Sequence, residues 1–269
     1  MFKKNSTKKK INLDLKKHEK YLRKELFLTD TKWPQYNLLF DDIKRLAKQF
    51  KKDKNIVFLE RNLLYGGNSL FKPFFNLNHV TSVDCSSKRI KKRGKYQFKY
   101  IKNKNIIKNE EFNKLHCDYR KIKLKSNFAD LIIIPNLIHH VAEHDKLFQE
   151  CSRILKKKGK LYIFEPTLRE VHQHPDDFIR FTPNGLLNVL IKNKFKKNLV
   201  KTVGGAFTAS IYCLNQAIQF LPDKEKTKFN FLVSKNFFKK MVNYEKKYKK
   251  NLSRKNVSFP TAFSLLVSK

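Results

Sequence analysis

The sequence predicts an α/β fold built on a mostly parallel sheet, and two observations support that prediction. First, short apolar runs recur along the chain, each ending at an acidic residue or a proline; they lie at 56–59, 80–83, 129–134 and 161–164. Continuous apolar runs of this length are typical of parallel strands that are buried on both faces. Second, residues 143–158, between the last two runs, place apolar side chains on one helical face. Strand, helix and strand in this order indicate a parallel sheet covered by helices.

The remaining helices follow from local patterns. Apolar residues recur at helical spacing over 15–26 and again over 34–50, where Pro34 precedes the apolar stripe. Thr182 followed by Pro183 is a favoured N-cap and first-turn pair, which predicts a helix that continues through Ile191.

The remaining strands complete the organisation of the chain. They are expected at 112–117, 200–214 and 262–267. The stretch between the last two, about 215–256, is expected to be a helical insertion. We therefore predict a Lys-rich N-terminal arm over 1–33 and a single domain over 34–269.

Composition excludes several classes of protein. The chain has 269 residues, of which 41% are hydrophobic, so it has enough apolar material for a buried core and is not expected to be disordered. No apolar run approaches the roughly 20 residues needed to span a bilayer, and no apolar stretch follows the basic N-terminus as in a signal peptide. The cysteines form no C-x-x-C pair that would indicate a zinc knuckle; they are Cys85, Cys117, Cys151 and Cys213. We expect a cytoplasmic protein.

The net charge of +37 has two interpretations. Such a charge commonly indicates a polyanionic partner. However, lysine outnumbers arginine about five to one, and Asn, Ile and Phe are also abundant, which indicates a compositional drift of the whole gene. Scattered lysines mainly solvate a surface, whereas arginines make the bidentate contacts that bind phosphates and bases. Nucleic acid is therefore a possible but not a favoured partner.

The lysines of 235–256 are interleaved with aromatic residues, and this stretch keeps three alternatives open. Aromatic rings among cations suit the stacking of nucleic-acid bases. The same spacing is more often simply packed core. A helix over 235–250 with one apolar and one basic face is also typical of membrane-surface association.

Acidic residues end two of the predicted strands, where ligands of open α/β sheets bind. Glu60 and Asp84 are 24 residues apart, and a carboxylate at this spacing suits ribose hydroxyls. The alternative for Asp84 is a helix N-cap together with Ser86 or Ser87. Asp118 follows the expected edge strand, where it is placed either to accept from an adenine amino group or to form a surface turn.

Five of the eight histidines lie at two strand ends: His139, His140, His144, His172 and His174. Their spacing is not that of a known zinc ligand set and no cysteine joins them, so we predict no metal site. Adjacent His139 and His140 cannot face the same way. We expect one to be buried and hydrogen-bonded and the other to line a cleft, where it is suited to act as a general base.

The segment 172–182 combines imidazoles, carboxylates and one of the few arginines. One interpretation is a capping loop in which Asp176 or Asp177 pairs with Arg180. The other is an acceptor pocket that contains a base and an arginine that orients the acceptor.

Four stretches together resemble the class I S-adenosylmethionine-dependent methyltransferases, in particular the small-molecule branch of type 11; they are 80–84, 128–132, 136–141 and 152–161. The resemblance covers about 55–200, and the later H-P-D-D-F-x-R-F-T run is similar to bacterial members that are often associated with cell-surface glycans or secondary metabolites. It implies that 34–269 is a methyltransferase domain with a Rossmann-like seven-stranded sheet, helices on both faces and an antiparallel last strand, which 262–267 fits.

The resemblance also implies S-adenosylmethionine as the cofactor and a donor site for it. Glu60 and the following loop would lie near its methionine, Asp84 on its ribose, Asp118 near its adenine, and Asn136 with Leu137 beneath its sulfonium. The full set implied is Glu60, Arg61, Gly66, Gly67, Asp84, Cys85, Asp118, Tyr119, Asn136 and Leu137. One departure concerns the family's G-x-G-x-G loop, because Arg61 replaces the first glycine and either blocks the donor or binds its carboxylate.

The sequence thus predicts an enzyme that transfers a methyl group to oxygen or nitrogen of a small molecule or a cell-surface glycan precursor. We expect His140 or His172 to be the base, and His139, His174 and Arg180 to orient the acceptor. The alternative is a basic RNA-binding protein on a methyltransferase scaffold, either an RNA methyltransferase or a protein without catalysis.

Overall fold

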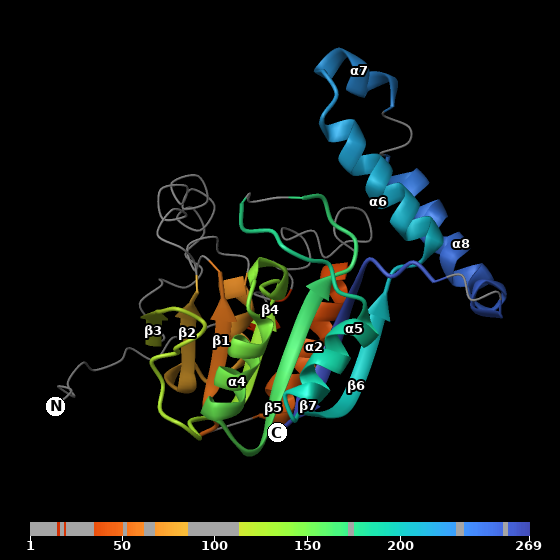
Figure 1. Cartoon of the computed structure of the whole chain (residues 1–269). Helices are drawn as coiled ribbons and strands as arrows, with labels where there is room; N and C mark the ends of the chain where they lie inside the picture. The colour runs from red at the N-terminus through yellow and green to blue at the C-terminus, as the bar shows by residue number, and fades with distance from the viewer. Residues whose placement is uncertain are drawn as a thin grey trace.

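A seven-stranded sheet lies at the centre of the structure, a computed structural model that describes residues 15–16, 19, 35–50, 53–61, 68–85, 113–171, 175–229, 234–254 and 258–269. The strand order is β3-β2-β1-β4-β5-β7-β6. The strands are β1 Ile56–Glu60, β2 Val80–Asp84, β3 Asn113–His116, β4 Ala129–Pro135, β5 Leu155–Pro166, β6 Lys196–Val203 and β7 Ala262–Ser268. Six strands run in one direction and β7 runs antiparallel to β5 and β6, which confirms the predicted Rossmann-like sheet (Figure 1).

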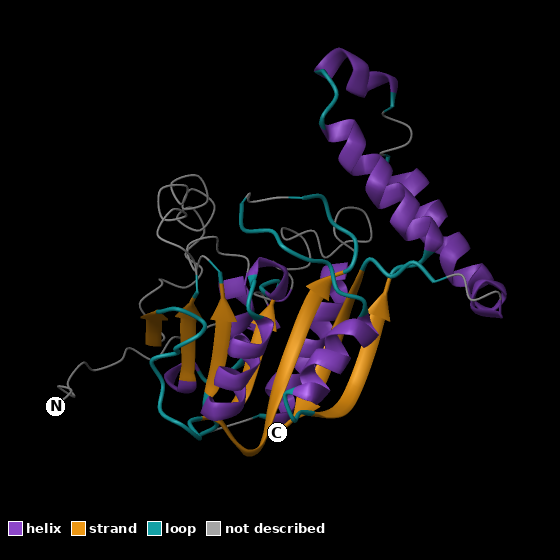
Figure 2. Cartoon of the chain, in the orientation of Figure 1, coloured by secondary structure: helices purple, strands orange, loops and turns teal. Residues whose placement is uncertain are grey.

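Helices cover both faces of this sheet (Figure 2). α2, Gln35–Gln49, lies on one face, while α4, His144–Ile154, and α5, Pro183–Lys192, lie on the other. The core alternates along β1: Leu59 belongs to the apolar cluster that includes α4 and α5, and Phe58 to the cluster that includes α2. Because both faces are covered, every residue of β1 is buried, which explains its continuous apolar run.

The boundaries of α5 and α4 test two predictions. The Thr182 side chain accepts a hydrogen bond from the Gly185 amide at 3.0 Å and Pro183 opens α5, so the predicted cap is confirmed. The predicted extent of the preceding helix is wrong, because α4 ends at Ile154 and Leu155 already pairs with Ala129 of β4. Most of the helix expected over 15–26 lies outside the described residues.

The strand expected over 200–214 is wrong beyond Val203. β6 ends there, and α6, Ala206–Gln219, follows after a turn at Gly204. Gly204 has a φ of +87°, and a Cβ added to it would lie 2.9 Å from the backbone nitrogen of Thr261, so the turn requires glycine. An apolar run of this length fits a strand and a helix equally well from periodicity alone.

The predicted helical insertion forms an arm, which we call the helical arm and which comprises α6, α7, Asp223–Lys228, and α8, Lys235–Arg254. It leaves the sheet where β6 ends and projects away from the body beside the carboxyl ends of the parallel strands (Figure 1). Across the described ranges, no helix is both long and apolar enough to cross a membrane.

Candidate active site

A cavity of about 160 Å³ lies at the carboxyl ends of the parallel strands. Four of its lining residues follow four successive strands: Arg61 after β1, Cys85 after β2, Tyr119 after β3 and Leu137 after β4. The other lining residues are His140, Val141, Ala142, Asp176 and Phe178. Strand order reverses between β1 and β4, so the cavity lies where open α/β sheets bind ligands.

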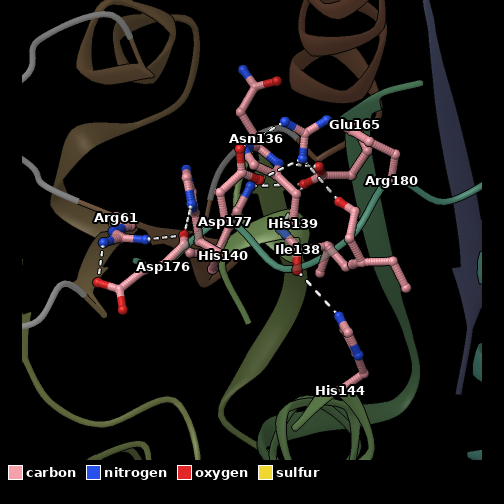
Figure 3. Close-up of polar contacts among 12 residues, drawn as sticks. Arg61, Asn136, Ile138, His139, His140, His144, Glu165, Asp176, Asp177 and Arg180 are labelled. Atoms are coloured by element: carbon pink, nitrogen blue, oxygen red, sulfur yellow. Dashed lines mark hydrogen bonds and ion pairs between the residues drawn. The ribbon is translucent and has the colours of Figure 1, made fainter. Parts of the chain in front are cut away.

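Arg61 and Asp176, which both line this cavity, form an ion pair that joins the end of β1 to the segment before α5 (Figure 3). Arg61 donates from Nη2 to the Asp176 carboxylate at 2.6 Å and from Nη1 to the Asp176 carbonyl at 2.9 Å. The arginine side chain is only 6% exposed. Burial lowers the pKa of Arg61, and Asp176 opposes that shift, so the guanidinium remains charged at neutral pH. Arg61 thus joins two segments that are far apart in the sequence.

His140 shares Asp176 with Arg61. Its Nδ1 lies 2.5 Å from the Asp176 carbonyl oxygen, which can only accept, so Nδ1 carries the proton. In the neutral ring the lone pair is then on Nε2. Asp176 therefore fixes both the arginine at the end of β1 and the imidazole of His140 (Figure 3).

Glu165, at the end of β5, holds the turn that follows β4. Its Oε1 accepts hydrogen bonds from the amides of Leu137 and Ile138, both at 2.7 Å, and its Oε2 lies 2.6 Å from Nδ1 of His139. All of these groups are buried. A single carboxylate thus positions the turn η5, Ile138–His140, which carries His140 to the cavity.

The two adjacent histidines have different surroundings, as the sequence analysis expects. His139 is buried against Glu165 and does not line the cavity, whereas His140 does. Their ring centroids are 4.0 Å apart. The amide of Phe178 donates to the His139 carbonyl at 2.8 Å, so the segment that contains Asp176 is attached to both histidines.

Arg180 belongs to a neighbouring cluster outside the cavity lining. It forms an ion pair with Asp177, with N–O distances of 2.5 and 2.8 Å, and donates to the Glu170 carbonyl at 2.9 Å. This is the capping-loop geometry that the sequence offers as one interpretation of 172–182. The other candidates in that segment, His172 and His174, lie outside the described residues.

Glu60 faces the interior and pairs with a lysine that the sequence analysis does not single out. Lys72, in the 3-10 helix η2, Asn68–Phe74, lies 2.8 and 3.1 Å from the two Glu60 carboxylate oxygens, and its side chain is completely buried. Burial raises the pKa of Glu60 and lowers that of Lys72, and each partner opposes the shift of the other. The next acidic residue of the set, Asp84, is mostly buried beside Glu60 in the β1–β2 register and does not line the cavity.

Asp118 is exposed and paired, rather than directed into the cavity. Arg120 donates to both of its carboxylate oxygens, which lowers the pKa of Asp118, and also to Glu143 at 2.8 Å. The Arg120 guanidinium lies 5.7 Å from the centroid of Tyr119. This cluster therefore supports the ring of Tyr119, which does line the cavity.

Asn136 marks the sharp exit from β4. Its φ is +53°, and its side-chain amide donates to the Tyr36 hydroxyl at 3.2 Å. Burial raises the pKa of Tyr36, so this hydroxyl stays protonated. Of the implied donor set, Gly66 and Gly67 lie outside the described residues.

The structure thus brings five of the predicted site residues to one cavity: Arg61, Cys85, Tyr119, Leu137 and His140. It places six others elsewhere: Glu60, Asp84, Asp118, Asn136, His139 and Arg180. Sequence reasoning missed Lys72, Glu165 and the double role of Asp176. Only the position of Glu165 at a strand end offered a signal. Among the residues described, no three His, Cys, Asp or Glu side chains gather as metal ligands.

The lining fits the nucleoside end of S-adenosylmethionine. An aromatic ring, an aliphatic side chain and the Cys85 thiol surround an apolar space beside His140. The volume of about 160 Å³ is smaller than the roughly 300 Å³ at which pockets for whole small molecules begin, so the described part holds only a portion of such a ligand. Residues 62–67 and 86–112, which adjoin β1 and β2 in the sequence, lie outside the described residues.

Comparison with known proteins gives a family match over part of the chain and a similarity in fold. The family described as "Methyltransferase domain" matches residues 65–163. A search of curated protein sequences gave no significant match.

Two solved structures illustrate the similarity in fold. A protein of Galdieria sulphuraria assigned as a sarcosine dimethylglycine methyltransferase has 14% identity and a TM-score of 0.53, with 87% of this chain and 85% of the other covered. The [4+2]-cyclase SpnF has 16% identity and a TM-score of 0.51, with 85% of this chain and 80% of the other covered. Because the second is named a cyclase, the shared fold does not fix the reaction. The strand order and the antiparallel β7 nevertheless agree with this similarity in fold, and residues 65–163 match the family described as a methyltransferase domain.

Proposed function

We propose that this protein is an S-adenosylmethionine-dependent methyltransferase that acts on oxygen or nitrogen of a small molecule or a cell-surface glycan precursor. The observation that carries the proposal is the meeting of His140 with residues that follow four successive strands, all on one cavity. The family match supports S-adenosylmethionine as the methyl donor.

The chain's own residues supply alignment at the donor side. Tyr119, Leu137 and Cys85 would hold the nucleoside, because they offer a ring and apolar surface at the ends of β2, β3 and β4. Arg61 would pair with the methionine carboxylate, since its guanidinium can exchange one bidentate partner for another. When bound, the donor supplies a methyl group that is already activated on a sulfonium.

At the acceptor side, His140 would remove a proton from a hydroxyl acceptor. The Asp176 carbonyl keeps the Nδ1 proton in place, so Nε2 is the nitrogen that would accept the proton. Phe178 and Val141 line the same cavity and would exclude water from it. Alignment, exclusion of water and a base are the main requirements for transfer from an activated donor.

Donor binding is tested first, by titrating S-adenosylhomocysteine into the purified protein in a calorimeter. We expect wild-type binding and about tenfold weaker binding for Tyr119→Ala, because stacking on the ring is lost. Tyr248→Ala on α8 is the matched control and should bind as the wild type does. If the wild-type protein binds neither this product nor S-adenosylmethionine, the proposed function is wrong.

The base is tested with acceptors found by transfer of a radiolabelled methyl group. His140→Gln should lower turnover of a hydroxyl acceptor about 100-fold and leave the affinity for S-adenosylhomocysteine within about twofold. His172→Ala is measured in parallel, because the sequence offers His172 as the other candidate. Normal turnover of His140→Gln together with an inactive His172→Ala would transfer the role to His172.

A further inference from the structure

Within the helical arm, α8 directs Phe238 and its acidic residue, Glu245, toward α6. Phe238 of α8 is 2% exposed, and α8 packs along α6. Glu245 accepts hydrogen bonds from the amides of Phe207 and Thr208 at 2.8 and 3.2 Å. These amides belong to the first turn of α6, whose N-cap is Gly205 and therefore has no capping side chain. Glu245 is the only acidic residue of α8, and it takes that role.

The outer face of α8 is consequently cationic. Lys239, Lys240, Lys246 and Lys247 are exposed, and at 100° per residue they fall within one arc of about 120°, opposite Phe238 and Glu245. We call these four side chains the lysine face. Eight of the 20 residues of α8 are basic, compared with 60 of 269 in the whole chain. Compositional drift raises lysine everywhere, but it does not explain this local excess on one side of a projecting helix.

The geometry favours a phosphate backbone over a lipid surface. A helix that lies in a membrane interface must present an apolar face to the acyl chains, whereas Phe238 of α8 is buried and the ring of Tyr244 contacts Phe207 of α6. The lysine face spans about 12 Å at 1.5 Å per residue, and each of its four ammonium groups can neutralise one backbone phosphate. Two of its lysines lie over tyrosine rings, Lys240 over Tyr244 at 6.0 Å and Lys247 over Tyr248 at 5.3 Å. Of these two rings, Tyr248 is exposed and suits contact with a base.

We propose that the lysine face of the helical arm binds the sugar–phosphate backbone of a single-stranded nucleic acid. β6 leads into the arm at the carboxyl ends of the parallel strands, where the cavity also lies. A nucleic acid bound to the arm would therefore lie on the same side of the protein as the candidate active site (Figure 1). The inference does not depend on donor binding, because the two surfaces share no residue.

Fluorescence anisotropy with a labelled 20-nucleotide single-stranded RNA tests the proposal between 50 and 200 mM salt. One variant replaces the lysine face with Lys239→Gln, Lys240→Gln, Lys246→Gln and Lys247→Gln. The matched control removes the same charge near the amino-terminal ends of β5 and β6, with Lys157→Gln, Lys158→Gln, Lys196→Gln and Lys197→Gln, all at exposed positions. Circular dichroism verifies that both variants keep their helices.

We expect the lysine-face variant to lose at least about tenfold in affinity and to have a log–log salt slope shallower by about 3, since each phosphate contact contributes roughly 0.7 in a single strand. The control should change the slope by less than about 1. Equal losses of RNA affinity in the two variants would mean that RNA binds through the overall positive charge of the protein and would overturn the proposal. An absence of RNA binding would also overturn it. Tighter association with anionic vesicles that RNA does not compete away would point to a membrane instead. Unchanged S-adenosylhomocysteine affinity in the lysine-face variant separates this result from the proposed function.

Discussion

Replacing Glu165 should damage the fold and the candidate active site together, because one carboxylate holds the turn after β4. Its Oε1 accepts two amide hydrogen bonds, from Leu137 and Ile138, and its Oε2 contacts His139. The side chain is 2% exposed, so water does not replace these contacts when the carboxylate is removed. The comparison of Glu165→Ala with Glu165→Gln separates the loss of the acceptor from the loss of the charge.

The size of the effect follows from the groups left behind. In Glu165→Ala the two buried amides lose their acceptor at about 1–3 kcal/mol each, and the imidazole contact is also lost. We therefore expect unfolding to become about 4 kcal/mol easier. In Glu165→Gln the amide oxygen can still accept from both amides, and only the charge assistance and the match to His139 change. The expected loss there is about 1–2 kcal/mol.

Urea unfolding followed by circular dichroism measures both values, and S-adenosylhomocysteine affinity measures the effect on the cavity. Glu165→Ala should also weaken binding, since Leu137 and His140 lie on the turn that it releases. The reasoning is refuted if Glu165→Ala unfolds within about 1 kcal/mol of the wild type, or if Glu165→Gln is as unstable as Glu165→Ala. The first result would mean that packing alone holds the turn, and the second that the charge on Glu165 matters more than its acceptor oxygen.

Three further predictions concern stability. Lys72→Met leaves Glu60 buried without its cation and should lower the unfolding free energy by about 3–5 kcal/mol, while adding Glu60→Gln should restore most of the loss in urea titrations. Gly204→Ala should cost about 2 kcal/mol by the same measurement, because a Cβ at φ +87° meets Thr261, and an unchanged midpoint would contradict this. Burial lowers the pKa of His144 below its ordinary 6.5, so the unfolded chain takes up the proton first and stability falls as pH drops below about 6.5. His144→Gln should therefore lose less stability than the wild type between pH 7.5 and 5.5, and equal pH profiles would exclude the effect.

The strands could be predicted from the sequence wherever the sheet is covered on both faces. β1 and β2 are buried along their whole length and each ends at a carboxylate, but only β1 is a continuous apolar run, since β2 contains Thr81 and Ser82. The segment that became α6 could not be predicted from periodicity, since its apolar residues fit either structure. The turn at Gly204 decides between them, and it depends on the close approach of Thr261, which is distant in the sequence.

For the candidate site, the sequence predicts where residues lie in the fold but not which partners they contact. Residues that follow strand ends were expected to meet, and Arg61, Tyr119 and Leu137 do meet on the cavity. The ion-pair partners of the residues at strand ends could not be predicted, because the sequence does not show which oppositely charged side chain will lie next to each of them. Glu60 is paired by Lys72 from η2, which follows it in the chain, and Asp176 reaches Arg61 across 115 residues. Whether these residues bind the donor and the acceptor remains a prediction.

The departure from the glycine loop and the role of Asp176 have one physical explanation. A glycine after β1 lets backbone approach a ligand, and Arg61 removes that option at its own position. The arginine instead pairs with Asp176, whose carbonyl also accepts from His140. If a ligand carboxylate replaces the Asp176 carboxylate on Arg61, the backbone contact to His140 can persist while the ion pair is exchanged. Arg61→Gln then distinguishes two roles: weaker S-adenosylhomocysteine binding means that the arginine holds the ligand, and tighter binding means that it obstructs the cavity.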